Sequence, residues 1–210
     1  MTLTRYLKDL KPSPVVAYYR LKQGVSFQYI LILDQINEMV LKDLSAIIKD
    51  TYLECKILSE TEFLNCLDVF PMEFLDFKYQ GELLLGSDII RDRKASKKNL
   101  RHECEFYLRS RLLSLREAYV SIPDQTALLI NDSFPLFRQT FRYLALMLRL
   151  KWDVNDFEGS MKTLGKTMGV DVSILIRIHD HLDRPQFLDA HFFEYHDTLT
   201  EIVQFVDGMD

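Results

Sequence analysis

The sequence predicts an α+β fold: a small mixed β-sheet with flanking helices, followed by a C-terminal α-helical bundle. Two observations lead to this prediction. Up to Gly86, runs of β-branched and aromatic residues alternate with apolar residues at helical spacing. After Gly86 the character changes, and from about Lys97 onward the apolar residues recur only at helical spacing. We therefore expect an α/β domain over residues 1–92 and a helical bundle domain over residues 93–210.

The first half reads as alternating strands and helices. Val15 to Tyr19 is rich in β-branched and aromatic residues, and the run from Ser26 is apolar enough at its end for a buried strand. Ser59, followed by Glu62, is a helix N-cap signal. In order, we expect a helix over 2–10, a strand hairpin over 15–19 and 26–33 with its turn at 22–24, a helix over 37–49, a strand over 53–58, a short helix through Leu67, a strand over 71–78, a turn over 79–81 and a strand over 82–85.

The second half reads as helices alone. An apolar stripe from Leu100 to Tyr119 predicts a long helix that ends at the break Ser121-Ile122-Pro123-Asp124. A second helix is expected from Gln125 to about Lys151, with a kink or a break at Pro135. Shorter helices are expected over 156–168, 172–182 and 185–206.

Charge argues against nucleic-acid wrapping. The 210 residues include 26 Lys and Arg against 31 Asp and Glu, a formal net charge of -5, whereas nucleic-acid binding depends on phosphate neutralisation by cations. One basic cluster stands out, and we interpret it as the solvated start of a helix. Its members are Arg91, Arg93, Lys94, Lys97, Lys98 and Arg101.

The cysteines and the hydropathy favour the cytoplasm. Cys55, Cys66 and Cys104 are odd in number and far apart, which predicts buried free thiols in a reducing compartment. No apolar run reaches the length of a membrane helix, and the first ten residues lack the apolar core of a signal peptide.

Three motifs carry a family resemblance. They are Phe70-Pro71-Met72-Glu73-Phe74-Leu75-Asp76, then Leu84 to Asp88, and a helix with the run Arg111-Leu112-Leu113-Ser114-Leu115-Arg116-Glu117-Ala118-Tyr119. With them the chain resembles bacterial nucleotidyltransferase-like proteins of the minimal and kanamycin-type group over about residues 12–150. The resemblance implies a small mixed sheet followed by a helical bundle.

The family's catalytic signature is missing where the resemblance places it. The signature is a Gly-Ser turn that holds phosphates, followed by Asp-x-Asp on a strand that binds Mg²⁺. Here the strand over 26–30 carries no carboxylate. Candidates for a residual acidic site are Asp34, Glu73 and Asp76. On a strand, the last two would face opposite sides. Lys22 is the candidate phosphate contact. We expect no metal and no cofactor, with Mg²⁺ bound only if these residues form a non-standard site.

Histidines near the C-terminus form the densest group of metal-ligand types. They are His179, His181, His191 and His196, accompanied by Asp180, Asp183 and Glu194. His191 and Glu194 are spaced to share a helix face, but a zinc-protease order is absent, so a surface helix is the preferred interpretation. Arg184 and His191 also have the spacing of a ribonuclease group that accompanies minimal nucleotidyltransferases.

Three functional hypotheses follow. The first is a non-catalytic protein of nucleotidyltransferase fold that binds a protein partner or its own copy through the helical half, as a homodimer. The second is a nucleotide-binding regulator, or a divergent enzyme, with a non-standard Mg²⁺ site. The third is a component of a toxin–antitoxin pair.

Overall fold

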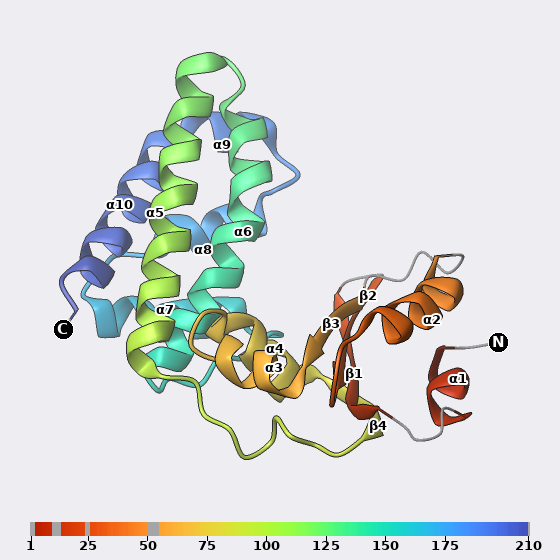
Figure 1. The fold of residues 1–210 in the computed structure, drawn as a ribbon. Helices are drawn as coiled ribbons and strands as arrows, with labels where there is room; N and C mark the ends of the chain where they lie inside the picture. The colour runs from red at the N-terminus through yellow and green to blue at the C-terminus, as the bar shows by residue number, and fades with distance from the viewer. Residues whose placement is uncertain (1–2, 10–13, 24–25, 50–54, 210) are drawn as a thin grey trace. The chain divides into compact units, whose positions relative to one another are not determined.

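A computed structural model describes residues 3–9, 14–23, 26–49 and 55–209, and the chain divides into two compact units. The first unit, Met1–Asn99, contains a four-stranded sheet with helices. The described residues of the second unit, Leu100–Asp210, form helices and no strand. The prediction of an α+β protein with a mixed sheet in its first half and helices in its second half is confirmed (Figure 1).

The sheet has the strand order β3-β2-β1-β4. Strands β1 (Val15–Gln23) and β2 (Ser26–Leu33) form the predicted antiparallel hairpin. Strand β3 (Cys55–Ser59) runs parallel to β2, and β4 (Glu82–Gly86) runs antiparallel to β1. Strand β1 extends through residues 22 and 23, which were predicted to lie in the turn. The remaining turn residue, 24, and the predicted strand start at 53 and 54 lie outside the described residues.

Helices flank both faces of this sheet. On one face, side chains of β1 and β2 pack with α1 (Leu3–Asp9) and α2 (Glu38–Ile48) in a core of Leu7, Tyr18, Leu31, Leu33 and Leu44. The alternating residues point to the other face and include buried Tyr19, Leu21, Ile30 and Ile32. There α3 (Glu60–Cys66) contacts β2 and β3, and α4 (Pro71–Gln80) contacts β1.

The segment predicted as a strand over 71–78 is a helix, α4. Pro71 occupies the first helical turn, where its fixed φ suits a helix and its missing N–H costs nothing. Met72 and Leu75, like Phe74 and Phe77, are buried and three residues apart, which is helical spacing. The prediction was wrong because bulky apolar residues dominate this short run, and such a run does not distinguish a buried strand from a buried helix.

The predicted N-cap at Ser59 is confirmed. The Ser59 hydroxyl accepts a hydrogen bond from the Glu62 N–H at 3.1 Å, and a Glu62 carboxylate oxygen accepts the Ser59 N–H at 2.8 Å. This reciprocal capping box satisfies two backbone donors at the start of α3. It also ends β3 and turns the chain onto the sheet face that α4 covers.

The second unit begins along α5 (Lys97–Ser121) and continues through α6 (Thr126–Met147). Four more helices follow: α7 (Phe157–Met168), α8 (Ser173–Asp180), α9 (Pro185–Ala190) and α10 (Phe192–Asp207). Helix α6 continues through Pro135, so of the two outcomes predicted there the break is excluded. One prediction needs correction. The single helix predicted over 185–206 is two helices, divided at His191.

An aromatic cluster fills the core of the second unit. Phe137, Phe141 and Tyr195 are each fully buried. The Phe137 ring centroid lies 6.4 Å from that of Phe141 and 6.3 Å from that of Tyr195, edge to face in the second case. The Tyr195 hydroxyl lies 3.0 Å from the Ser133 Oγ, so its polar end is satisfied. Burial raises the pKa of Tyr195, which therefore stays neutral in this core.

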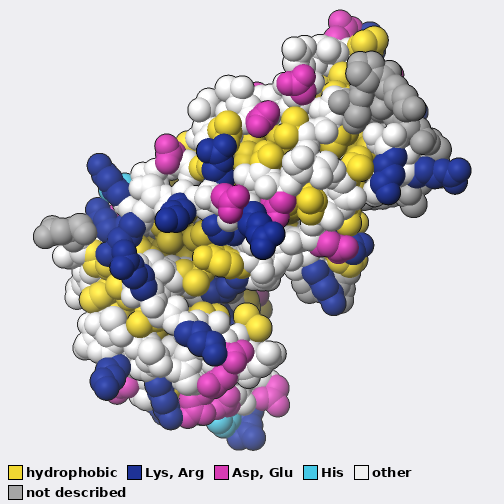
Figure 2. All heavy atoms as spheres, turned by 90° about the horizontal axis from the view of Figure 1, so that it is seen from below, with side chains coloured by type: hydrophobic (Ala, Val, Ile, Leu, Met, Phe, Trp, Pro, Cys, Tyr) yellow, Lys and Arg dark blue, Asp and Glu magenta, His cyan; other side chains and the backbone are white. Residues whose placement is uncertain are grey.

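The surface mixes apolar and charged side chains. Figure 2 shows one face, on which hydrophobic side chains reach the surface among Lys, Arg, Asp and Glu. Cys55, Cys66 and Cys104 are free, as predicted, but only Cys104 is buried, whereas Cys55 and Cys66 are partly exposed. Among the described residues, no helix combines the length and the apolar character needed to cross a membrane.

Candidate functional site

Glu73 of α4 faces the strand on which the resemblance places metal-binding carboxylates. The Gln28 side-chain amide of β2 donates to the Glu73 Oε1 at 3.1 Å, and the Lys56 ammonium of β3 forms an ion pair with the same oxygen. Gln28 is neutral, so it supplies no charge for a cation. The Lys56 ammonium compensates the negative charge of Glu73. A site for a divalent cation beside β2 would need carboxylates whose charge is not compensated in this way.

Asp34 lies at the opposite end of β2 from Gln28. Its side chain is exposed, and its backbone N–H donates to the Pro14 carbonyl oxygen at 2.8 Å. At about 3.3 Å for each residue of a strand, the six steps from Gln28 to Asp34 span about 20 Å. Asp34 and Glu73 therefore do not converge on one ion.

Asp76 is placed differently from the expectation for a strand. On α4, Glu73 and Asp76 are three residues apart and lie on neighbouring positions of the helix surface rather than on opposite sides. Asp76 is 8% exposed, whereas the Glu73 carboxylate remains half-buried beside Lys56. Among the described residues, no group of three or more His, Cys, Asp and Glu side chains has a geometry that could hold a metal ion.

Lys22 points away from Glu73. In the β1–β2 ladder, Lys22 pairs with Phe27, and Leu21 pairs with Gln28. Cross-strand partners share a face, and consecutive residues alternate between faces. Lys22 is exposed and belongs to the face opposite the one that carries Gln28 and Glu73. The three residues predicted for the acidic site and the predicted phosphate contact, Lys22, thus lie in three places, with only Glu73 and Asp76 adjacent.

The motif from Leu84 to Asp88 shapes the backbone where β4 ends. Gly86 has φ +86°, and a Cβ added there would lie 2.2 Å from the Val16 carbonyl oxygen. That carbonyl accepts the Ser87 N–H at 2.9 Å. Only glycine combines this dihedral with so close an approach to β1.

Tyr19 and Asp88 hold the loop after β4. The Tyr19 hydroxyl donates to the Asp88 Oδ1 at 3.0 Å and accepts the Ile89 N–H at 2.9 Å. The same Asp88 oxygen accepts the Arg91 N–H at 3.1 Å. Burial, followed by the hydrogen bond to Asp88, raises the pKa of Tyr19, so the hydroxyl keeps the proton that it donates. These contacts give the motif a structural role.

His191 and Glu194 each contact the same arginine. Arg177 of α8 forms an ion pair with Glu194, and its Nη1 lies 3.3 Å from the His191 Nε2. The His191 Nδ1 lies 2.7 Å from the Phe187 carbonyl oxygen, to which it donates as the protonated nitrogen, so Nε2 accepts from Arg177. The rings of His181 and His191 both stack on Phe187, at 4.7 and 4.2 Å. Both His191 nitrogens therefore hold helices α8, α9 and α10 together.

The remaining histidines of the group lie elsewhere. The His179 ring packs on Phe157 at a centroid distance of 4.4 Å, and burial, followed by the Arg138 charge, lowers the pKa of His179. His196 accepts the Arg116 Nε at 2.9 Å. Arg184 is exposed and directly precedes α9, and the guanidinium that meets His191 belongs to Arg177. No local sequence pattern indicates Arg177, which lies 14 residues before His191.

The basic cluster is largely exposed. Arg91, Arg93, Lys94, Lys97 and Lys98 are all exposed in the loop before α5 and in its first turn. Arg101, the sixth member, is half-buried and pairs with Glu105 at 3.2 Å while it donates to the Val206 carbonyl oxygen at 3.2 Å. Five members of the basic cluster are therefore solvated, as expected for the start of a helix. Arg101 instead packs within the helical unit.

Helix α5 carries an exposed apolar stripe that the sequence interpretation missed. Phe106, Leu113 and Val120 are 67%, 56% and 80% exposed and follow one another at intervals of seven residues. Residues seven apart lie on the same side of a helix. The buried residues of α5 occupy the other side: Leu100, Cys104, Leu108, Leu112 and Leu115. We call Phe106, Leu113 and Val120 the α5 stripe. The seven-residue spacing of Phe106, Leu113 and Val120 could have indicated this stripe in the sequence. It was missed because the more numerous buried apolar residues of the same helix dominate the pattern.

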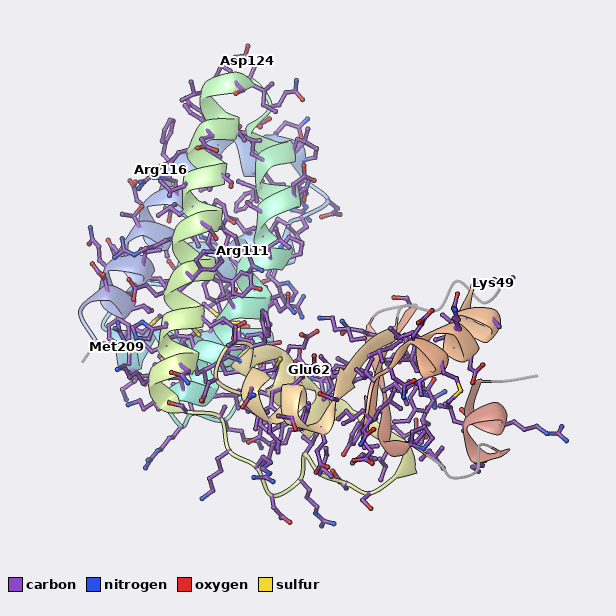
Figure 3. All side chains as sticks on the ribbon, in the orientation of Figure 1. Lys49, Glu62, Arg111, Arg116, Asp124 and Met209 are labelled. Carbon is purple, nitrogen blue, oxygen red and sulfur yellow. The ribbon has the colours of Figure 1, made fainter. Side chains whose placement is uncertain are left out.

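Two arginines fix α5 between its neighbours. Arg111 reaches α6, where it donates to the Thr140 hydroxyl. Arg116 reaches α10, where its Nη2 donates to the Thr200 hydroxyl at 3.3 Å. Figures 1 and 3 show α5 between α6 and α10, with Arg111 and Arg116 leaving opposite sides of the helix. The α5 stripe is thereby held facing outward.

We compared the chain with models of protein families, with curated proteins and with solved structures, and none of the three comparisons gave a match.

Proposed function

We propose that this chain is a non-catalytic protein with a nucleotidyltransferase-like first half, and that it acts by protein binding through its helical half, with its own copy as a partner. The α5 stripe carries this proposal. Three large apolar side chains, each more than half exposed, recur at a single heptad position along one side of α5, and an exposed apolar surface of this kind marks a site of association.

The arrangement around Glu73 supports the non-catalytic part of the proposal. Two-metal nucleotidyl transfer needs several carboxylates that share two cations. Here Gln28 stands on the strand that would supply them, and Lys56 compensates Glu73. Asp34 is about 20 Å along the strand from Gln28. The resemblance carried by Phe70–Asp76 and Leu84–Asp88 is accounted for by packing in α4 and by the loop that Tyr19 and Asp88 hold.

Neither alternative has a specific observation in its favour. A nucleotide-binding regulator with a Mg²⁺ site of Asp34, Glu73 and Asp76 requires these three residues to converge. A phosphate contact from Lys22 requires Lys22 to lie on the sheet face that carries Gln28 and Glu73, and it lies on the opposite face. A ribonuclease site in a toxin–antitoxin pair requires Arg184 beside His191, where Arg177 binds. We place the protein in the cytoplasm because its three cysteines are free thiols.

A turnover assay tests the non-catalytic assignment. The purified chain, incubated with Mg²⁺ and each ribonucleoside triphosphate, is expected to release no pyrophosphate above a protein-free blank. Glu73→Gln is the matched control, because it removes the carboxylate charge that Gln28 of β2 and Lys56 of β3 contact. Pyrophosphate release by the wild type that disappears in Glu73→Gln would contradict the proposal and establish the Mg²⁺-dependent alternative.

A further inference from the structure

We propose that the partner of the α5 stripe is a second copy of this chain, and that the two α5 helices pair in parallel orientation about a two-fold axis. This inference rests on the proposed function and adds the identity and direction of the partner. Charge on the two edges of the stripe carries it.

The stripe has edges of opposite charge. At about 100° for each residue, Arg116 lies about 60° to one side of Leu113, and Glu117 lies about 40° to the other side. Both therefore border the surface between Leu113 and Val120. Arg116 hydrogen-bonds to His196 and Thr200, and among the described residues neither Arg116 nor Glu117 takes part in a salt bridge. The stripe thus presents one cationic and one anionic edge at the same height.

Parallel pairing matches these edges. When two identical helices pack face to face in parallel, the left edge of one lies beside the right edge of the other. Arg116 of each copy then meets Glu117 of the other, which forms two symmetric ion pairs beside the packed Leu113 and Val120 side chains. The apolar contact extends over the 14 residue steps from Phe106 to Val120, about 21 Å of helix.

Antiparallel pairing mismatches them. In that orientation, each edge of one helix lies beside the same edge of the other. In antiparallel coiled coils, likewise, e positions meet e positions and g positions meet g positions. With Leu113 at the centre, Arg116 of each copy would face Arg109 of the other, because the two residues lie at nearly equal distances on either side of Leu113. Arg109 is already paired with Glu105 and Asp207 of its own chain, so antiparallel pairing gives Arg116 no anionic partner, whereas parallel pairing gives two Arg116–Glu117 contacts.

A charge-reversal cycle tests the pairing in the full-length chain. Arg116→Glu and Glu117→Arg alone are each expected to weaken the dimer by about tenfold, since each replaces two attractive contacts by two repulsive ones. The double variant is expected to restore wild-type affinity, measured by sedimentation equilibrium. A purely structural role for Arg116 beside His196 predicts no such rescue, so a double variant as weak as Arg116→Glu overturns the proposal.

Cysteine cross-linking gives the direction independently. Under mild oxidation, Val120→Cys is expected to link to Val120→Cys of a second copy, and Phe106→Cys to Phe106→Cys, with the wild type as the control for native thiols. A link between Phe106→Cys and Val120→Cys in a mixture, without the two symmetric links, contradicts parallel pairing. These outcomes are distinct from a failure of the non-catalytic assignment, because that failure appears as pyrophosphate release whatever the oligomeric state.

Discussion

Replacing Phe137 with alanine is expected to destabilise the helical unit by about 3–5 kcal/mol, which is the usual cost of emptying a buried phenylalanine site. Phe137 has no exposed surface and contacts the rings of both Phe141 and Tyr195. The surrounding rings come from α6 and α10 and cannot collapse into the space without moving these helices. Hydrogen exchange of peptides from residues 100–210 measures the free energy of opening of this unit by itself.

Leu128→Ala is the matched control for this substitution. Leu128 is also on α6, but it is 46% exposed, so its truncation is expected to cost about 0.5 kcal/mol or less. If Phe137→Ala exchanges as slowly as Leu128→Ala, the aromatic cluster is not the core of this unit.

Replacing Gly86 with alanine is expected to destabilise the first unit by about 2–4 kcal/mol. An alanine at φ +86° adopts a left-handed conformation that costs about 1–2 kcal/mol. Its Cβ would also lie 2.2 Å from the Val16 carbonyl oxygen, so β4 must move away from β1. The same movement disturbs the loop that Tyr19 and Asp88 hold, and faster exchange is expected in the peptides of β1 and β4 together.

Gly169→Ala separates the two causes. Gly169 also has a positive φ, +71°, at the end of α7, but an added Cβ meets nothing within 4 Å. Only the conformational cost of about 1–2 kcal/mol is expected there. An equal loss of stability in both variants would show that the close approach of β4 to β1 contributes nothing.

Local signals explain which elements the sequence predicted. The capping box of Ser59 and Glu62 depends on neighbouring residues only, and so does the left-handed end of α7 at Gly169. Strand β2 was predicted with its observed ends because a continuous apolar run is buried between two helix layers. Where an element depended on tertiary packing, the pattern was ambiguous. The run from Pro71 became α4 because it packs across β1.

The division at His191 has a similar cause. The sequence over 185–206 has a helical pattern throughout, yet His191 turns its Nδ1 to the Phe187 carbonyl and its Nε2 to Arg177. These contacts compete with helix continuation, and Arg177 is too distant in sequence for a local pattern to include it. The same limit applies to the candidate site. The contacts of Glu73 with Gln28 and Lys56 join residues 45 and 17 positions apart.

The central claim is that this protein acts through association along the α5 stripe. Sedimentation equilibrium of Leu113→Glu tests it most directly, with Leu128→Glu as a control that places the same charge on an exposed leucine of α6. We expect a dimer for the wild type and for Leu128→Glu, and a folded monomer for Leu113→Glu. A monomeric wild type, or a Leu113→Glu variant that remains as dimeric as Leu128→Glu, would contradict the account.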